Sequence, residues 1–244
     1  MKILLIIIVL GLTACASKTD EPSTDDYQTF SGLKNGELIY QGPITKASNE
    51  ALFEAYEKSD KSPQKLVVSS PGGNISLGME LGKWIKDHNL DVEVSNICAS
   101  SCANYVLTAA NRKYLRKDSI LIWHGSAWQE KWHNDKLNQV NLSNYLASMR
   151  DKETELFERF KVDNLLTVYG QSKLTLWDRI LFLFGRNKVG WDYSIEDMNR
   201  FGLSNIVLID KEWDWRKYRH NQRELVKRVK VDSEYYFKLH RFEM

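Results

Sequence analysis

Short apolar segments alternate with amphipathic helical segments along most of the chain. The apolar runs are the predicted strands, at residues 38–44, 66–69, 92–95, 120–124 and 205–209. Between them, apolar side chains recur at helical spacing in residues 48–59 and 76–88, and a third helix is predicted from Ser101 to about Ala110. This alternation predicts an α/β fold with a largely parallel sheet whose faces are covered by helices.

Beyond His124 the pattern changes to longer helices. They are predicted over residues 136–160 and 174–184, so a helical insertion at about residues 130–190 follows the central strand. The segment 174–184 is strongly apolar. Such a stripe most often packs on the core or on another subunit, and the alternatives are contact with a membrane surface and the lining of a substrate groove.

The N-terminus has the pattern of an export signal. An apolar run at residues 3–12 leads into the sequence Leu-Thr-Ala-Cys, whose cysteine is Cys15. A membrane-spanning helix needs roughly 20 apolar residues, so this shorter run predicts a cleaved bacterial lipoprotein signal with Cys15 lipidated. An ordinary secretory signal with an incidental cysteine is the lesser alternative. Ala16, by resemblance to Gram-negative lipoproteins, favours an anchor in the outer membrane facing the periplasm.

Differences in composition along the chain predict its division into segments. Residues 17–31 are polar and read as a flexible tether. The predicted divisions are a signal peptide at 1–14, a lipidated cysteine and tether at 15–35, a domain at 36–210 and a basic helical C-terminal extension at 211–244. An apolar fraction of 43% and an aromatic fraction of 11% are those of a globular domain. The net charge of +2 is too small to indicate a nucleic-acid partner.

Two cysteines remain after Cys15, and the export signal places them in an oxidising compartment. Cys98 and Cys102 stand four residues apart across the predicted start of a helix. Their Cα atoms can then lie near about 6 Å, which is within the disulfide range, so a disulfide between them is a candidate. A zinc site is disfavoured because no second pair of soft ligands stands at ligand spacing. The sequence implies no metal and no cofactor.

Three segments carry candidate chemistry. A Ser-Pro-Gly-Gly turn at residues 70–73 follows a strand and can present backbone N–H groups to an oxyanion, although such a turn alone is more often only a turn. The small-residue segment at 98–104 opens a helix, where Ser100 can act as the N-cap while Ser101 projects into a site. His124 ends an apolar strand, where it can serve as a general base or be an ordinary half-buried histidine.

A carboxylate to orient His124 has to come from further along the chain. Asp192, just before a predicted short helix at 195–201, is the first choice by analogy with the family that these segments resemble, with Glu196 or Asp197 as fallbacks. Ser, His and Asp in these roles would constitute a triad for nucleophilic catalysis.

The order of these segments resembles the proteolytic subunit of Clp protease and its relatives in the Clp/crotonase superfamily. That family's Ser-Pro-Gly-Gly stands at residues 70–73, and its catalytic serine, six residues before the leucine of a Leu-Thr-Ala run, matches Ser101. Its histidine matches His124. Its third residue matches Asp192, which precedes a helix that closes with Phe-Gly-Leu at 201–203 and a final strand.

The resemblance implies a Clp/crotonase fold with a helical insertion and a serine peptidase. The export signal places this peptidase in the cell envelope, where ATP is absent, so it would act without the ATP-driven unfoldase that serves the Clp subunit. Ser101 would attack the peptide carbonyl, His124 would transfer the proton and Asp192 would orient the imidazole. The N–H groups of Gly73 and Cys102 would hold the oxyanion. The implied partners are a peptide or protein substrate, a membrane through the lipid anchor and further copies of the chain.

Two alternatives remain. Some signal peptide peptidases of this superfamily use a lysine as the base, and Lys113 and Lys117 follow the Ser101 helix. The other alternative is a non-catalytic envelope lipoprotein that uses the same fold as a binding or assembly module.

Overall fold

The computed structural model describes residues 29–129, 139–173, 175 and 189–236. The predicted signal peptide, Cys15 and most of the predicted tether lie outside these residues, as does nearly all of the apolar segment 174–184. In the part of the chain that is described, no helix is long and apolar enough to cross a membrane.

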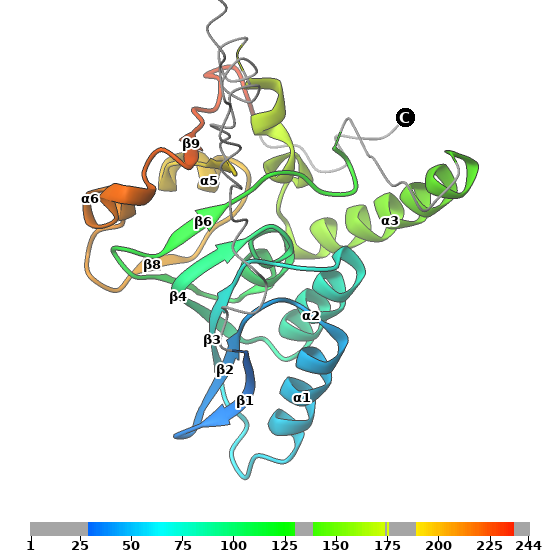
Figure 1. The fold of residues 1–244 in the computed structure, drawn as a ribbon, viewed down its shortest axis with the longest axis vertical. Coiled ribbons are helices and arrows are strands. Elements are labelled where there is room, and N and C mark those ends of the chain that lie inside the picture. The colour runs from blue at the N-terminus through cyan, green and yellow to red at the C-terminus, as the bar shows by residue number, and fades with distance from the viewer. Residues whose placement is uncertain (1–28, 130–138, 174, 176–188, 237–244) are drawn as a thin grey trace, which may run out of the picture.

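A seven-stranded sheet forms the centre of the fold (Figure 1). Its strands are β1 (Phe30–Lys34), β2 (Glu37–Gln41), β3 (Lys65–Ser70), β4 (Asp91–Ala99), β5 (Lys113–Leu115), β6 (Ile120–Ile122) and β8 (Ile206–Leu208). The order is β1-β2-β3-β4-β5-β8, and β6 also pairs with β4. β1 and β2 are antiparallel, while the other neighbours are parallel. The predicted α/β fold with a largely parallel sheet is therefore confirmed.

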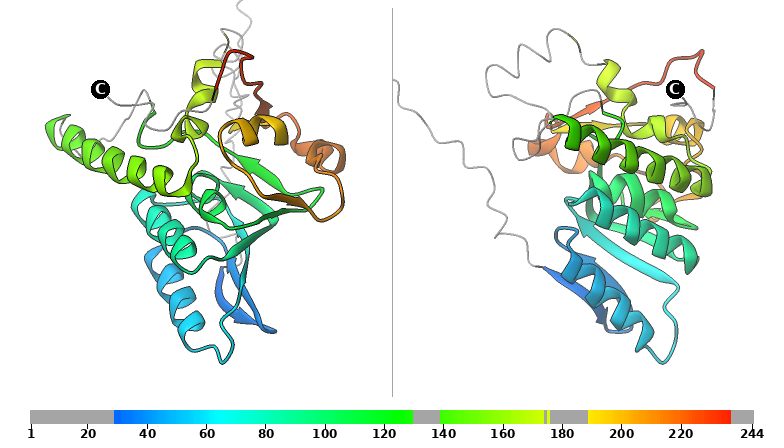
Figure 2. Two further views of the ribbon diagram at one scale, coloured as in Figure 1. Left: turned by 180° about the vertical axis from the view of Figure 1, so that it is seen from behind. Right: turned by 90° about the vertical axis from the view of Figure 1, so that its right-hand side faces the viewer.

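Helices cover one face of this sheet in a row. α1 (Lys46–Glu57), α2 (Ile75–Asp87) and α3 (Gln139–Phe160) lie side by side there (Figures 1 and 2). The short π-helix η2 (Cys102–Leu107) packs against α2. The other helices among the described residues are η3 (Asn164–Thr167), η4 (Tyr169–Lys173), α5 (Ile195–Arg200), α6 (Trp215–Tyr218) and η5 (His220–Gln222).

Strand β4 is longer than its apolar pattern predicts, and it organises the site. Its first half pairs with β5 and its second half with β6, on the same edge. The predicted run of residues 92–95 stops before Asn96, a polar and exposed residue, and so misses the second half of the strand. The first half contains a buried acidic residue. Glu93 is 5% exposed and accepts hydrogen bonds from Lys65 at 2.6 Å and from the Nε atom of Arg116 at 2.9 Å. Pairing of this kind is what makes a buried carboxylate tolerable.

Both ends of the fold extend beyond the predicted domain of residues 36–210. The sheet begins at Phe30 rather than near Gly36, because β1 pairs along its whole length with β2. At the other end, β9 (Val226–Arg228) pairs with β7 (Gly190–Asp192) as a second small parallel sheet. The described part of the predicted helical extension, residues 211–236, is mostly non-helical. It adds Trp213, Trp215, Val226, Val229 and Val231 to the core.

Candidate functional site

Three segments that carry candidate chemistry meet at the carboxyl ends of parallel strands. Ser70, the last residue of β3, lies beside Cys98 of β4. Ala99, the last residue of β4, lies beside Ile122, the last residue of β6. The Pro-Gly-Gly turn, the serine pair and His124 therefore leave the sheet at the same edge, which is where α/β proteins commonly bind ligands.

The Pro-Gly-Gly turn contacts the serine turn directly at Gly72. This residue has φ +94°, a conformation that favours glycine. A Cβ atom at this position would lie 2.5 Å from the carbonyl oxygen of Ala99 and 2.6 Å from Cβ of Ser100. The hydroxyl of Ser70 accepts a hydrogen bond from the Gly72 N–H at 3.1 Å and holds the turn in place. Only a glycine lets the two turns approach so closely.

Ser101 is buried beneath this junction. Its side chain is 1% exposed, and its hydroxyl donates a hydrogen bond to the carbonyl oxygen of Gly73 at 2.8 Å. Helix α2 covers it from the other side, since a Cβ at Gly78 would lie 2.7 Å from Cβ of Ser101. The single hydroxyl proton of Ser101 is thus directed to Gly73 and not to His124.

Ser100, the preceding residue, is half-buried and has a different backbone. Its φ is +55°, in the left-handed region that serine seldom adopts. Its N–H donates to the carbonyl of Ile122 at 2.9 Å, and its own carbonyl accepts the N–H of Asn104 at 2.8 Å. Ser100 therefore forms the sharp corner where β4 turns into the following helix.

A disulfide spans the serine pair. Cys98 and Cys102 are joined with an S–S distance of 2.01 Å and a Cα–Cα distance of 5.2 Å, and both are fully buried. The bridge ties the end of β4 to the first residue of η2. Cys102, whose N–H is a candidate oxyanion donor, is fixed in position by it.

His124 follows the third strand end. The preceding residue, Trp123, is paired with Trp191 of β7, with N–H to carbonyl distances of 2.8 and 2.7 Å. The side-chain amide of Asn104 on η2 donates to the carbonyl of Gly125 at 2.8 Å and connects the serine helix to the histidine segment. The His124 side chain is exposed, yet the protein atoms around it displace part of its hydration and lower its pKa. No described side chain is hydrogen-bonded to its ring.

Asp192, the predicted orienting carboxylate, is fully buried and bonded to other groups. Arg216 donates to its two oxygens at 2.7 and 2.9 Å, and Arg228 does so at 2.9 and 3.1 Å. The indole N–H of Trp215 adds a bond at 2.9 Å. These bonds fasten the C-terminal segment to β7, and His124 is not among the partners.

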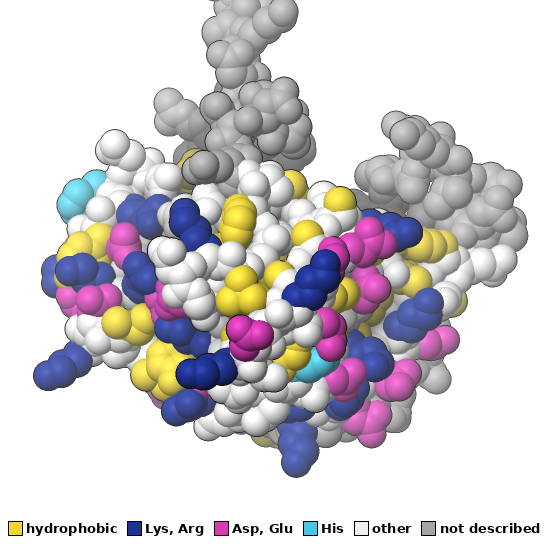
Figure 3. All heavy atoms as spheres, turned by 90° about the horizontal axis from the view of Figure 1, so that it is seen from below, with side chains coloured by type: hydrophobic (Ala, Val, Ile, Leu, Met, Phe, Trp, Pro, Cys, Tyr) yellow, Lys and Arg dark blue, Asp and Glu magenta, His cyan; other side chains and the backbone are white. Residues whose placement is uncertain are grey.

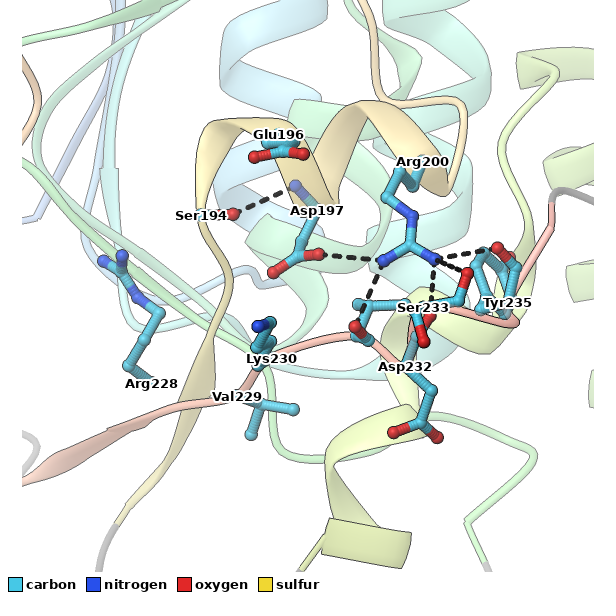
Figure 4. A pocket seen from close by; sticks show the side chains of 11 residues that line it. Ser194, Glu196, Asp197, Arg200, Arg228, Val229, Lys230, Asp232, Ser233 and Tyr235 are labelled. Atoms are coloured by element: carbon cyan, nitrogen blue, oxygen red, sulfur yellow. Dashed lines mark hydrogen bonds and ion pairs between the residues drawn. The ribbon is translucent and has the colours of Figure 1, made fainter.

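The two fallback carboxylates line a separate cavity of about 860 Å³ between α5 and residues 228–235 (Figure 4). Asp197 points toward Arg200 and accepts a bond from its guanidinium at 3.3 Å. Arg200 in turn donates to the carbonyls of Val231 at 3.1 Å and Tyr235 at 2.8 Å. Arg200 thereby holds the C-terminal segment against α5.

The lysines proposed as alternative bases lie at other places. Lys113 is in β5, opposite Val92 at the beginning of β4, whereas the serine pair follows the end of that strand. Its ammonium donates to the carbonyl of Ala110 at 2.7 Å, and burial lowers its pKa to about 8. The ammonium of Lys117 lies 4.9 Å from the ring centre of Tyr218.

Glu153 on α3 is a residue of this region that the motif search did not find. It is fully buried, and its Oε2 atom accepts bonds from the Tyr105 hydroxyl of η2 at 3.1 Å and from the Ala127 N–H at 3.0 Å. Within the described residues its Oε1 atom has no partner. Burial raises the pKa of Glu153 to about 7. A signal was present in the sequence, because Glu153 interrupts the buried stripe formed by Met149 and Phe157.

Glu153→Gln is expected to remove a pH dependence of stability. The pKa of about 7 in the fold exceeds the ordinary 4.5, so this group favours the folded state most below pH 4.5 and loses that contribution as the pH rises through 7. The loss corresponds to about 3 kcal/mol. Urea unfolding at pH 5 and pH 8.5 measures it: the decrease in unfolding free energy between these pH values should be smaller in the variant. An unchanged decrease, or the same effect in Glu155→Gln on the exposed side of α3, contradicts the assignment.

Charged side chains elsewhere in the described residues form no metal-type cluster and, on the face shown in Figure 3, no field of one sign. In the described ranges, no group of three or more His, Cys, Asp or Glu side chains is placed to hold a metal ion. Basic and acidic side chains are interspersed on the face shown in Figure 3. A nucleic-acid surface would instead carry a field of one sign.

Comparison with known proteins adds no constraint: no protein-family model matches the chain, and no curated protein matches it.

Proposed function

We propose that this chain is a lipid-anchored serine peptidase of the bacterial cell envelope with a Clp/crotonase-like fold. The observation that carries the proposal is the convergence of the Pro-Gly-Gly turn, the serine turn and His124 at one sheet edge. The sequence resemblance rests on the same segments in the same order. It assigns the attack to Ser101, with His124 as the base.

The chemistry requires a hydroxyl, a base and an oxyanion site within one small volume. A serine of the 100–101 pair attacks the carbonyl of a peptide bond, and His124 accepts and returns the proton. The N–H groups of Gly73 and Cys102 stabilise the negative charge on the carbonyl oxygen, a contribution of about 3 kcal/mol for each such donor. Because its pKa is lowered, the His124 imidazole stays neutral, and able to accept a proton, at a lower pH than an ordinary histidine does. No cofactor and no ATP enter this scheme.

The second candidate is the non-catalytic module. It is favoured by the bond from the Ser101 hydroxyl to the Gly73 carbonyl and by the arginine partners of Asp192, both of which leave the predicted triad unassembled in this structure. A homo-oligomer is part of the peptidase proposal, because contacts between copies can rearrange such a site.

Hydrolysis by the purified chain distinguishes the candidates. The full chain in detergent, with its disulfide intact, is incubated with fluorogenic peptides and small esters. The peptidase proposal predicts turnover that a fluorophosphonate abolishes in a time-dependent way. A folded protein that hydrolyses neither peptides nor esters at any protein concentration tested overturns it and favours the module.

A further inference from the structure

The two adjacent serines at the end of β4 have opposite environments. Ser101 is 1% exposed and lies between Gly73 and Gly78, and its hydroxyl donates a hydrogen bond to a backbone carbonyl. Ser100 is half-buried and no described group is hydrogen-bonded to its hydroxyl. A peptide carbonyl can approach Ser100, whereas contact with Ser101 requires α2 or the glycine turn to move.

The backbone of Ser100 is also the unusual one. A φ of +55° is energetically unfavourable for serine, and such conformations persist where the surrounding structure enforces them, often at functional sites. Here the disulfide between Cys98 and Cys102, which flank the two serines, and the hydrogen bond from the Ser100 N–H to the Ile122 carbonyl enforce this backbone conformation. A strained strand-to-helix corner at a serine is the backbone geometry of a nucleophile elbow.

Ser100 contacts both of the other candidate segments. Its Cβ lies so close to Gly72 of the glycine turn that a Cβ at position 72 would be only 2.6 Å away from it. Its N–H bonds to Ile122, and His124 follows two residues later at the same end of β6. Ser100 therefore lies between the glycine turn, which contains the Gly73 oxyanion donor, and the end of β6, which leads into His124.

We infer that Ser100, and not Ser101, is the nucleophile, an inference that rests on the proposed hydrolase function. Ser100 Oγ forms a bond to the carbonyl carbon of the peptide while its proton passes to the His124 imidazole. The C–N bond then breaks, the leaving amine takes that proton, and an ester on Ser100 remains. A water molecule attacks the ester, giving a proton to His124, which returns it to the departing Ser100 oxygen. Ser101 has a positioning role, in which its bond to Gly73 holds the glycine turn.

The site of covalent labelling tests this directly. The full wild-type chain is labelled with a fluorophosphonate, then reduced and digested with trypsin, and the peptide of residues 87–112 is fragmented in a mass spectrometer. Fragment ions distinguish an adduct on Ser100 from one on Ser101. We expect the adduct on Ser100.

Ser100→Gly is the companion variant, because glycine adopts φ +55° without strain. We expect it to fold with an unfolding midpoint no lower than that of the wild type and to lose labelling to the level of heat-denatured protein. An adduct on Ser101 or on another residue, or undiminished labelling of Ser100→Gly, overturns the inference and leaves the hydrolase function standing. A folded wild type that is not labelled at all overturns the hydrolase function itself, and the inference with it.

Discussion

Asp192→Ala is expected to lower the free energy of unfolding by about 3–5 kcal/mol, which is the usual effect of removing one partner from a buried ion pair. Asp192 is fully buried, and its oxygens accept bonds from Arg216, Arg228 and the indole of Trp215. Without the carboxylate, two guanidinium groups repel each other beside a buried N–H group. Denaturant unfolding measured at neutral pH gives the value.

The matched control for this variant is Arg228→Ala. The Arg228 side chain is 40% exposed, compared with 21% for Arg216, so the Arg228 charge is better solvated and its removal should cost clearly less. A loss below about 1 kcal/mol in Asp192→Ala, the range typical of exposed pairs, would show that the carboxylate does not hold the C-terminal segment. The same result would reopen the possibility that it serves His124.

His124→Gln is expected to lower kcat/KM for peptide and ester substrates by roughly 10²–10⁴-fold, the usual contribution of a general base. Because protein atoms lower the pKa of His124 below 6.5, the wild-type rate should rise with pH to a plateau whose midpoint lies below 6.5. Steady-state kinetics across pH 4 to 9 measures both effects.

His88→Gln provides the control. His88 caps α2, where its Nδ1 atom lies 2.8 Å from the Trp84 carbonyl and its ring packs on Tyr56 and Trp84. Its replacement should leave the rate and the pH midpoint unchanged. Equal losses in both variants would mean that the decrease reflects general damage to the fold, and an unchanged rate in His124→Gln would exclude this histidine as the base.

Local patterns were sufficient for the parts of the fold that bury one continuous apolar face. α1, α2 and β3 were predicted within a few residues because their apolar spacing is regular. β5 was missed because it has only three residues and one of them is a lysine, Lys113, which is buried with its ammonium donating a hydrogen bond to the carbonyl of Ala110. A run this short with a charged residue in it has no apolar pattern typical of a strand.

Some features of the candidate site follow from local sequence and others do not. Its three segments were located from turn chemistry and from their order, which are local properties of the chain. Contacts with distant residues determined the rest: Ser101 is enclosed by a glycine of α2, and Asp192 is bonded to arginines that stand 24 and 36 residues further along the chain. Neither contact leaves a pattern near the residue it affects. Local sequence therefore locates the candidate segments, whereas the surroundings of each residue in them depend on contacts with distant parts of the chain.

The most direct test of the central claim is the rate of covalent labelling by a fluorophosphonate as a function of pH, in the wild type and in His124→Gln. An activated serine served by His124 predicts one equivalent of label per folded chain, a rate that rises with a midpoint below pH 6.5, and near-complete loss in the variant. No labelling of the folded wild type, or the same pH-independent labelling in both proteins, would contradict the account.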